Sequence, residues 1–127
     1  MLPRAHRLTD AESFRAAVRS GRRASSRTVV VHLLVEGPDP AGAGPRAGFV
    51  VSKAVGNAVT RNHVQRRLRH LVREQLDSLP RSGVLVVRAL PASAGATSAE
   101  LRTDLTRCLQ QAATQRNRQG AREVPAS

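Results

Sequence analysis

The chain has 127 residues, and its 21 basic and 9 acidic side chains give it a formal charge of +12. This length fits one domain with tails and excludes a multidomain enzyme, while a hydrophobic fraction of 40% is enough for one compact core. The single cysteine, Cys108, excludes an internal disulfide bond and a cysteine-based zinc site.

The charge and the apolar runs indicate where the protein works and what it binds. No apolar run approaches the ~20 residues that span a bilayer, and the basic start of the chain leads into Thr9, Asp10 and Glu12 instead of an apolar signal core. We therefore expect a cytoplasmic protein with no membrane partner. The strong positive charge indicates a polyanionic partner, nucleic acid before any other.

The first predicted element is a helix over residues 10–20. Its start reads as a capping box, in which Thr9 caps the helix and Glu12 reaches back to the cap. The apolar residues that follow are spaced three and four apart, which places them on one helix face. Gly21 then ends the run.

Two strands are predicted next. Residues 27–35 are dominated by β-branched side chains, with His32 as the polar residue inside the run. The glycines and prolines of residues 36–45 mark a loop. Residues 46–53 read as a second strand, and we expect it to pair with the first as a hairpin.

A long basic helix and a third strand follow. Asn57 or Thr60 is expected to cap this helix, which is predicted to run to about residue 79, where Pro80 stops it. Residues 83–90 then read as a buried strand because they form one short apolar run.

The last helix completes the predicted domain. Thr97 and Glu100 form a second capping box at its start, and its apolar stripe includes Cys108, which is expected in the core. We expect one domain over residues 1–115 and a basic flexible tail over residues 116–127. The order helix, strand, strand, helix, strand, helix is typical of a small α/β sandwich of the α+β class, with a short mixed sheet covered by helices.

The basic helix has two different faces. At ~100° per residue, its apolar residues fall on one side, and the other side carries Asn62, Arg66, Arg69 and Arg73. This row lacks acidic partners at i,i+4, so contact with RNA or DNA is favoured over a salt-bridged solvated face. Arg61 falls toward the apolar side and is expected at the helix start, beside the turn of residues 55–57.

The stretch around this helix carries a distinctive motif. Residues 48–69 read GFVVSKAVGNAVTRNHVQRRLR, which places Ser-Lys, Gly-Asn-Ala-Val and Arg-Asn ahead of a run of arginines. This pattern resembles the signature of the bacterial ribonuclease P protein subunit. The resemblance covers about residues 3–111 and is far more specific than a basic patch.

The resemblance implies a protein that binds a large catalytic RNA, one protein per RNA, and with it cleaves the 5′ leader from precursor tRNA. The RNA supplies most of the active site and its Mg²⁺ ions, so no catalytic or metal-binding residue is expected in the protein. The protein contacts the leader and raises substrate and metal affinity. The implied fold has about four strands in the order αβββαβα, with a left-handed βαβ crossover as in one class of ribosomal-protein folds.

The resemblance also implies roles for individual residues. The side chains expected to face the RNA subunit are Lys53, Arg61, Asn62, His63, Arg66, Arg67, Arg69 and Arg73. Those expected in a leader-binding cleft between the first helix and the sheet are Phe14, Val18 and His32. Because Val18 and His32 stand where the family often has aromatic residues, stacking on leader bases is expected to be weaker or to fall to Phe14 and His32. His32 fits a partly buried strand residue equally well.

Three positions of the motif depart from the family pattern. His63 replaces an arginine, Gln65 replaces a lysine, and Ala54 stands where a second lysine is common. Each change removes positive charge, since an imidazole is charged only when protonated. Arg67 and His70 can compensate for part of that loss.

Other functions fit the sequence less well. A protein nuclease needs paired carboxylates or a close histidine-based acid–base pair, whereas the acidic residues are dispersed and His63 and His70 lie in the arginine row. A structural RNA-binding protein of ribosomal type would accept any basic surface, so the motif disfavours it. A DNA-reading module would need a short helix before the arginine helix, where this chain has a strand.

Overall fold

The computed structural model of the protein describes residues 6–35, 44–80 and 82–114. Across these ranges the helices are α1 (Ala11–Ser20), α2 (Ala58–Glu74) and α3 (Ser98–Ala113), and the strands are β1 (Arg22–Ser25), β2 (Val29–Val35), β3 (Arg46–Val50) and β4 (Gly83–Ala89). The order αβββαβα and the α+β class are confirmed. The proposed tail, 116–127, and residues 36–43 of the expected loop lie outside the described residues, so the division into domain and tail stays a prediction.

The sheet has the strand order β1-β2-β4-β3. β2 is antiparallel to both β1 and β4, whereas β3 is parallel to β4. The expected hairpin between residues 27–35 and 46–53 is therefore wrong, because β4 lies between these two strands. The hairpin partner of β2 is β1, a four-residue strand whose sequence, RRAS, carries no apolar pattern that predicts a strand.

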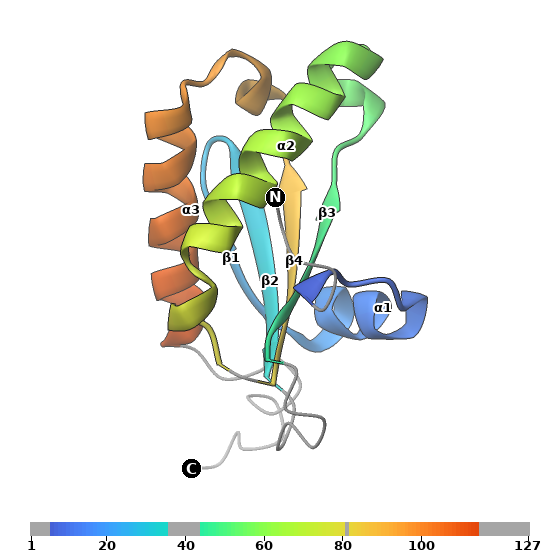
Figure 1. Cartoon of the computed structure of the whole chain (residues 1–127), viewed down its shortest axis with the longest axis vertical. Helices are drawn as coiled ribbons and strands as arrows, with labels where there is room; N and C mark the ends of the chain where they lie inside the picture. Colours follow the sequence, from blue (N-terminus) through green and yellow to red (C-terminus); the bar gives the residue numbers. More distant parts are fainter. Residues whose placement is uncertain (1–5, 36–43, 81, 115–127) are drawn as a thin grey trace.

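Helices cover both faces of the sheet (Figure 1). α1 packs on one face, where it contacts β2 and β4, and α2 and α3 pack on the other. Alternate residues of β2 point to opposite layers: Leu33 joins the large cluster with α2 and α3, and Leu34 joins a smaller cluster with α1. Burial on both faces explains why β2 and β4 are almost continuous apolar runs.

The connection from β3 through α2 to β4 is left-handed. In Figure 1 both strands point up, α2 crosses in front of the sheet, and β4 lies to the left of β3. A chain that rises at the back, descends in front and moves left traces a left-handed turn. This hand is rare in βαβ units, and the structure confirms the expectation that came from the family resemblance.

Several element boundaries differ from the expected ones. The cap of α1 is Asp10, whose carboxylate accepts hydrogen bonds from the backbone N–H groups of Glu12 and Ser13, so the predicted box of Thr9 with Glu12 is wrong. Asp10 competes better because a carboxylate is the stronger acceptor at a helix N-terminus. The second box, Thr97 with Glu100, is confirmed in both directions.

Two elements end earlier than expected. α2 stops at Glu74, and a short 3₁₀ turn, Leu76–Ser78, replaces its predicted last turn, which lets Leu79 enter the core with 8% of its surface exposed. β3 stops at Val50, and a 3₁₀ turn, Lys53–Val55, follows it. This second turn connects the edge strand β3 to α2.

Candidate nucleic-acid interface

A glycine and an asparagine fix the start of α2. The Asn57 side chain caps the helix by accepting a 2.9 Å hydrogen bond from the Thr60 backbone N–H. Gly56 has a φ of +157°, and a Cβ at this position would lie 2.9 Å from the Thr60 methyl carbon. A side chain at residue 56 would therefore push the first turn of α2 out of place, so the Gly-Asn pair sets where the basic helix begins.

The apolar stripe of α2 fixes which way its cations point. Its buried members contact the sheet and α3 in the main core, and they are Val64, Leu68, Leu71 and Val72. Asn62, Arg66 and Arg73 are exposed and Arg69 is half-buried. The two predicted faces of this helix are thus present in the structure.

The arginines of the exposed face have no partner among the residues that the structure describes. Within the part of the chain that the structure describes, Arg66, Arg69 and Arg73 form no hydrogen bond or ion pair with protein groups. We call these three residues the α2 arginine row. Unneutralised guanidinium groups on a fixed helix face are suited to phosphate oxygens, which they bind in a planar fork. Lys53 and His63, both exposed, lie on the turn before α2 and on its second turn.

Two other basic residues of α2 are placed differently. Arg67 is half-buried and donates a 3.1 Å hydrogen bond to the carbonyl oxygen of Ala96, just before α3. Arg61 is half-buried as well, and its Nε is buried with no hydrogen-bond partner among the described residues. The position of Arg61 toward the apolar side agrees with the helical spacing. The hydrogen bond from Arg67 holds α2 against Ala96, just before α3, so Arg67 has a structural role in addition to its charge.

A groove of about 680 Å³ lies between α2 and α3. Its cations include Arg66 and Arg69 from α2 and also Arg102 from α3, a residue that the sequence analysis missed. Glu74, at the end of α2, accepts a 3.2 Å hydrogen bond from Arg102 and lies 3.5 Å from His70. The predicted lack of acidic partners thus holds for the α2 arginine row, but not for His70.

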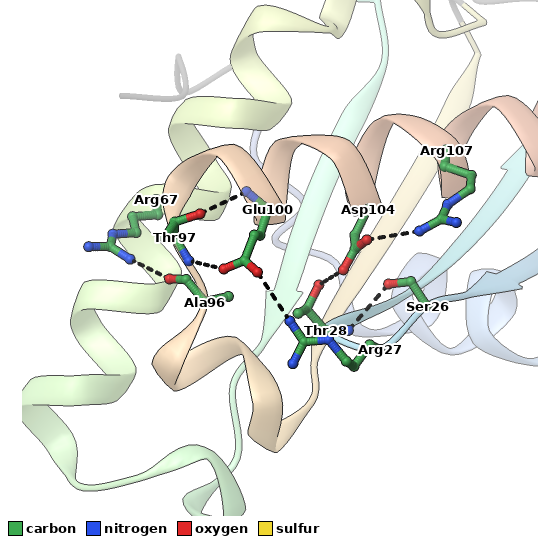
Figure 2. Close-up of polar contacts among 9 residues, drawn as sticks. All are labelled: Ser26, Arg27, Thr28, Arg67, Ala96, Thr97, Glu100, Asp104 and Arg107. Carbon is green, nitrogen blue, oxygen red and sulfur yellow. Dashed lines mark hydrogen bonds and ion pairs between the residues drawn. The ribbon is translucent and has the colours of Figure 1, made fainter.

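Charged and polar groups on the other side of α3 are paired (Figure 2). The Thr28 hydroxyl donates a 2.6 Å hydrogen bond to the Asp104 carboxylate, and both residues are buried. Arg107 donates to the other oxygen of Asp104 at 3.0 Å. The Thr28 bond, ahead of the Arg107 contribution, holds the pKa of Asp104 below its ordinary value. Sequence reasoning missed this pair, because its members are 76 residues apart and neither belongs to a motif.

The second predicted site lies on the α1 side of the sheet. Phe14 and Val18 are half-buried and pack on the small cluster that includes Leu34 and Val86. Phe14 also lines a hollow of about 300 Å³ with residues that precede α1. His32 pairs with Val86 in the sheet but is only 5% exposed. The structure therefore brings Phe14 and Val18 to the same surface and leaves the His32 ring largely covered.

The described residues contain no cluster suited to a metal ion, and their one cysteine is buried. No three His, Cys, Asp or Glu side chains gather there in a way that could hold a metal ion. Cys108 is 1% exposed, and burial raises the pKa of its thiol, as fits the predicted core residue. None of the helices over these ranges is long and apolar enough to cross a membrane.

Known proteins resemble this chain in both sequence and fold. The family model described as Ribonuclease P matches residues 2–118. A "Ribonuclease P protein component" from a Nocardioides species is 63% identical over 109 residues, covering 86% of this chain and 92% of the relative. Another protein of that name, from Corynebacterium diphtheriae, is 52% identical over 112 residues, which cover 86% of this chain and 94% of that relative.

Solved structures agree with these sequence matches. The RNase P protein of Staphylococcus aureus matches with a TM-score of 0.70 at 23% identity, covering 83% of this chain and 93% of that one. The RNase P protein of Thermotoga maritima matches with a TM-score of 0.67 at 23% identity, covering 80% and 92%. At this identity the structures show a shared fold, while the sequence matches show descent. The chain therefore belongs to the ribonuclease P protein family.

Proposed function

We propose that this chain, as the protein component of ribonuclease P, binds the catalytic RNA of that enzyme through the exposed face of α2. In this proposal one protein joins one RNA in the cytoplasm, and the complex removes the 5′ leader from precursor tRNA. The α2 arginine row carries the proposal, since its three guanidinium groups lack protein partners among the described residues. Most of the electrostatic binding would come from counterions released as these groups meet phosphates.

The protein contributes charge and position, and the RNA contributes the catalytic centre. We propose that the Mg²⁺ ions are held mainly by the RNA and its substrate. No three His, Cys, Asp or Glu side chains among the described residues gather in a way that could hold a metal ion. A protein of charge +12 lowers the repulsion between two RNA molecules. Raised affinity for precursor tRNA follows from that lowered repulsion, and raised affinity for Mg²⁺ is a separate part of the proposal.

The leader is the part of the substrate that the α1 side of the sheet is proposed to contact. Phe14 supports this proposal because it is the one aromatic residue of α1 and it lines an open hollow. A single-stranded leader exposes bases that can stack on such a ring, and one stacked base contributes ~1–3 kcal/mol. The half-buried Val18 would extend the apolar contact.

Cleavage of a precursor tRNA at low Mg²⁺ tests the function directly. The partner catalytic RNA is incubated with substrate in the presence and absence of this protein, beside a protein-only control. We expect cleavage only when both components are present. Binding without any stimulation of cleavage would instead favour a structural RNA-binding protein of ribosomal type.

A single substitution separates leader binding from RNA-subunit binding. Phe14→Ala should weaken binding of precursor tRNA to the complex while mature tRNA and the catalytic RNA bind as before. The loss expected from one stacked base is about fivefold or more in Kd. An equal loss for precursor and mature tRNA would place Phe14 in the fold rather than in the leader site.

A further inference from the structure

The first two turns of α2 expose an apolar side chain beside an imidazole. Val59 is 75% exposed, which makes it the one large hydrophobic residue that the described part of the chain leaves on the surface. His63 follows it by one helical turn and is exposed as well. Neither the core nor the α2 arginine row explains an apolar residue here.

Val59 and His63 border a hollow of about 240 Å³. Its other lining residues are Thr60, Val64 and Arg67 from α2 and Ala94 from the 3₁₀ turn Pro91–Gly95. Among the described residues, no carboxylate lines it. The hollow is smaller than the ~300–1,000 Å³ of sites for whole small molecules, so its size suits a single flat group.

One wall of this hollow is held in place. The hydrogen bond of 3.1 Å from Arg67 to the Ala96 carbonyl fixes the arginine side chain between α2 and the turn before α3. Val64 is 3% exposed and closes the floor. The hollow therefore combines a firm apolar floor, an imidazole and a cationic wall.

We propose that this hollow takes an unpaired base of the partner RNA, with Val59 and His63 against the base. The inference rests on the proposed function, because it assigns a base contact to the same RNA interface. Charge complementarity favours this occupant, since the cations beside the hollow include Arg67 and the α2 arginine row continues along the same helix. Splayed bases commonly stack on histidine and on apolar side chains in RNA-binding proteins.

This placement gives His63 a role that differs from a phosphate contact. A stacking residue acts through its ring, so its replacement changes affinity without changing the number of counterions released. A phosphate-binding residue acts through its charge, and its replacement lowers the salt dependence. The two roles can therefore be separated by ring-preserving and charge-preserving substitutions.

The test compares His63→Phe, His63→Ala and His63→Arg in the full-length protein, with equilibrium binding to the purified catalytic RNA measured over a salt series. His63→Ala should raise Kd about fivefold or more with an unchanged salt slope, as expected for the loss of one stacked base. His63→Phe should bind as tightly as the natural protein. Tight binding by His63→Arg together with a loss in His63→Phe would overturn the proposal.

Val59→Ala and a surface control complete the experiment. Val59→Ala should weaken RNA binding in the same direction as His63→Ala, while Gln110→Ala, at an exposed position of α3, should leave Kd unchanged. Unaltered binding by both Val59→Ala and His63→Ala would overturn the base contact alone. Failure of the natural protein to bind the RNA would instead overturn the proposed function, so the two results are distinguishable.

Discussion

The outward faces of α2 and α3 both carry arginine, but the two helices use it differently. Arg102 and Arg107 on α3 bond to Glu74 and Asp104, whereas the α2 arginine row has no protein partner among the described residues. Both helices bury an apolar stripe against the same face of the sheet. The neighbouring carboxylates, and not the number of arginines, distinguish the arginines of α3, which bond within the protein, from those of α2, which are open to phosphate.

The buried stripes should be equally important in both helices. Leu68 of α2 and Leu105 of α3 are both 0% exposed, and we expect Leu68→Ala and Leu105→Ala each to lower the free energy of unfolding by ~2–5 kcal/mol. Urea denaturation followed by circular dichroism measures both. If only one of the two variants lost stability, the two helices would not share one core.

The Thr28–Asp104 pair should stabilise the fold without affecting RNA binding. Asp104→Asn replaces a charged acceptor by a neutral one, and we expect a loss of ~1–3 kcal/mol in the free energy of unfolding at pH 7. RNA affinity at that pH should not change, because Asp104 bonds to Thr28, in the turn between β1 and β2, and not to the α2 arginine row. Weaker RNA binding by this variant would contradict the division between the two helices.

The same variant has a defined pH dependence. The pKa of Asp104 is lowered in the folded protein. The stabilisation that its carboxylate gives the fold is therefore complete above the ordinary carboxyl pKa of ~3.9. This stabilisation is lost as pH falls through the lower pKa of the folded protein. Urea denaturation at neutral and strongly acidic pH should therefore show the natural protein and Asp104→Asn converging in acid. A constant difference across pH would exclude the carboxylate as the cause.

Sequence patterns predicted the elements whose signals are local. The spacing of Val64, Leu68 and Leu71 gave the buried face of α2, and the Thr97–Glu100 box gave the start of α3. The fourth strand and the left-handed crossover came only from the family resemblance, because β1 has no apolar pattern and periodicity carries no information about hand.

Apart from the cap of α1 and the ends of α2 and β3, the failures involve contacts between distant segments. The predicted hairpin assumed that strands adjacent in the chain also pair, yet β4 enters between β2 and β3. The Arg67–Ala96 and Thr28–Asp104 bonds join separate elements, so no local pattern marks them. For the site, helical spacing placed the α2 arginine row correctly, but only the structure shows that Arg67 is engaged and that His32 is covered.

The smallest effect on stability and RNA affinity is expected for Arg102, which lines the groove between α2 and α3. Arg102→Ala breaks an exposed ion pair with Glu74, and such pairs contribute ~0–1 kcal/mol. We expect little change in thermal unfolding and little change in RNA affinity, since Glu74 already offsets this charge. A loss of RNA affinity as large as that of a row arginine would show that Arg102 contacts RNA directly.

The salt dependence of RNA binding distinguishes the two helices most directly. The double variants Arg66→Ala with Arg69→Ala and Arg102→Ala with Arg107→Ala remove the same charge from α2 and from α3. We predict that the α2 variant raises Kd and lowers the slope of log K against log salt by about two, one for each lost phosphate contact, whereas the α3 variant keeps the natural slope. Equal slopes for the two variants would contradict RNA binding by the exposed face of α2.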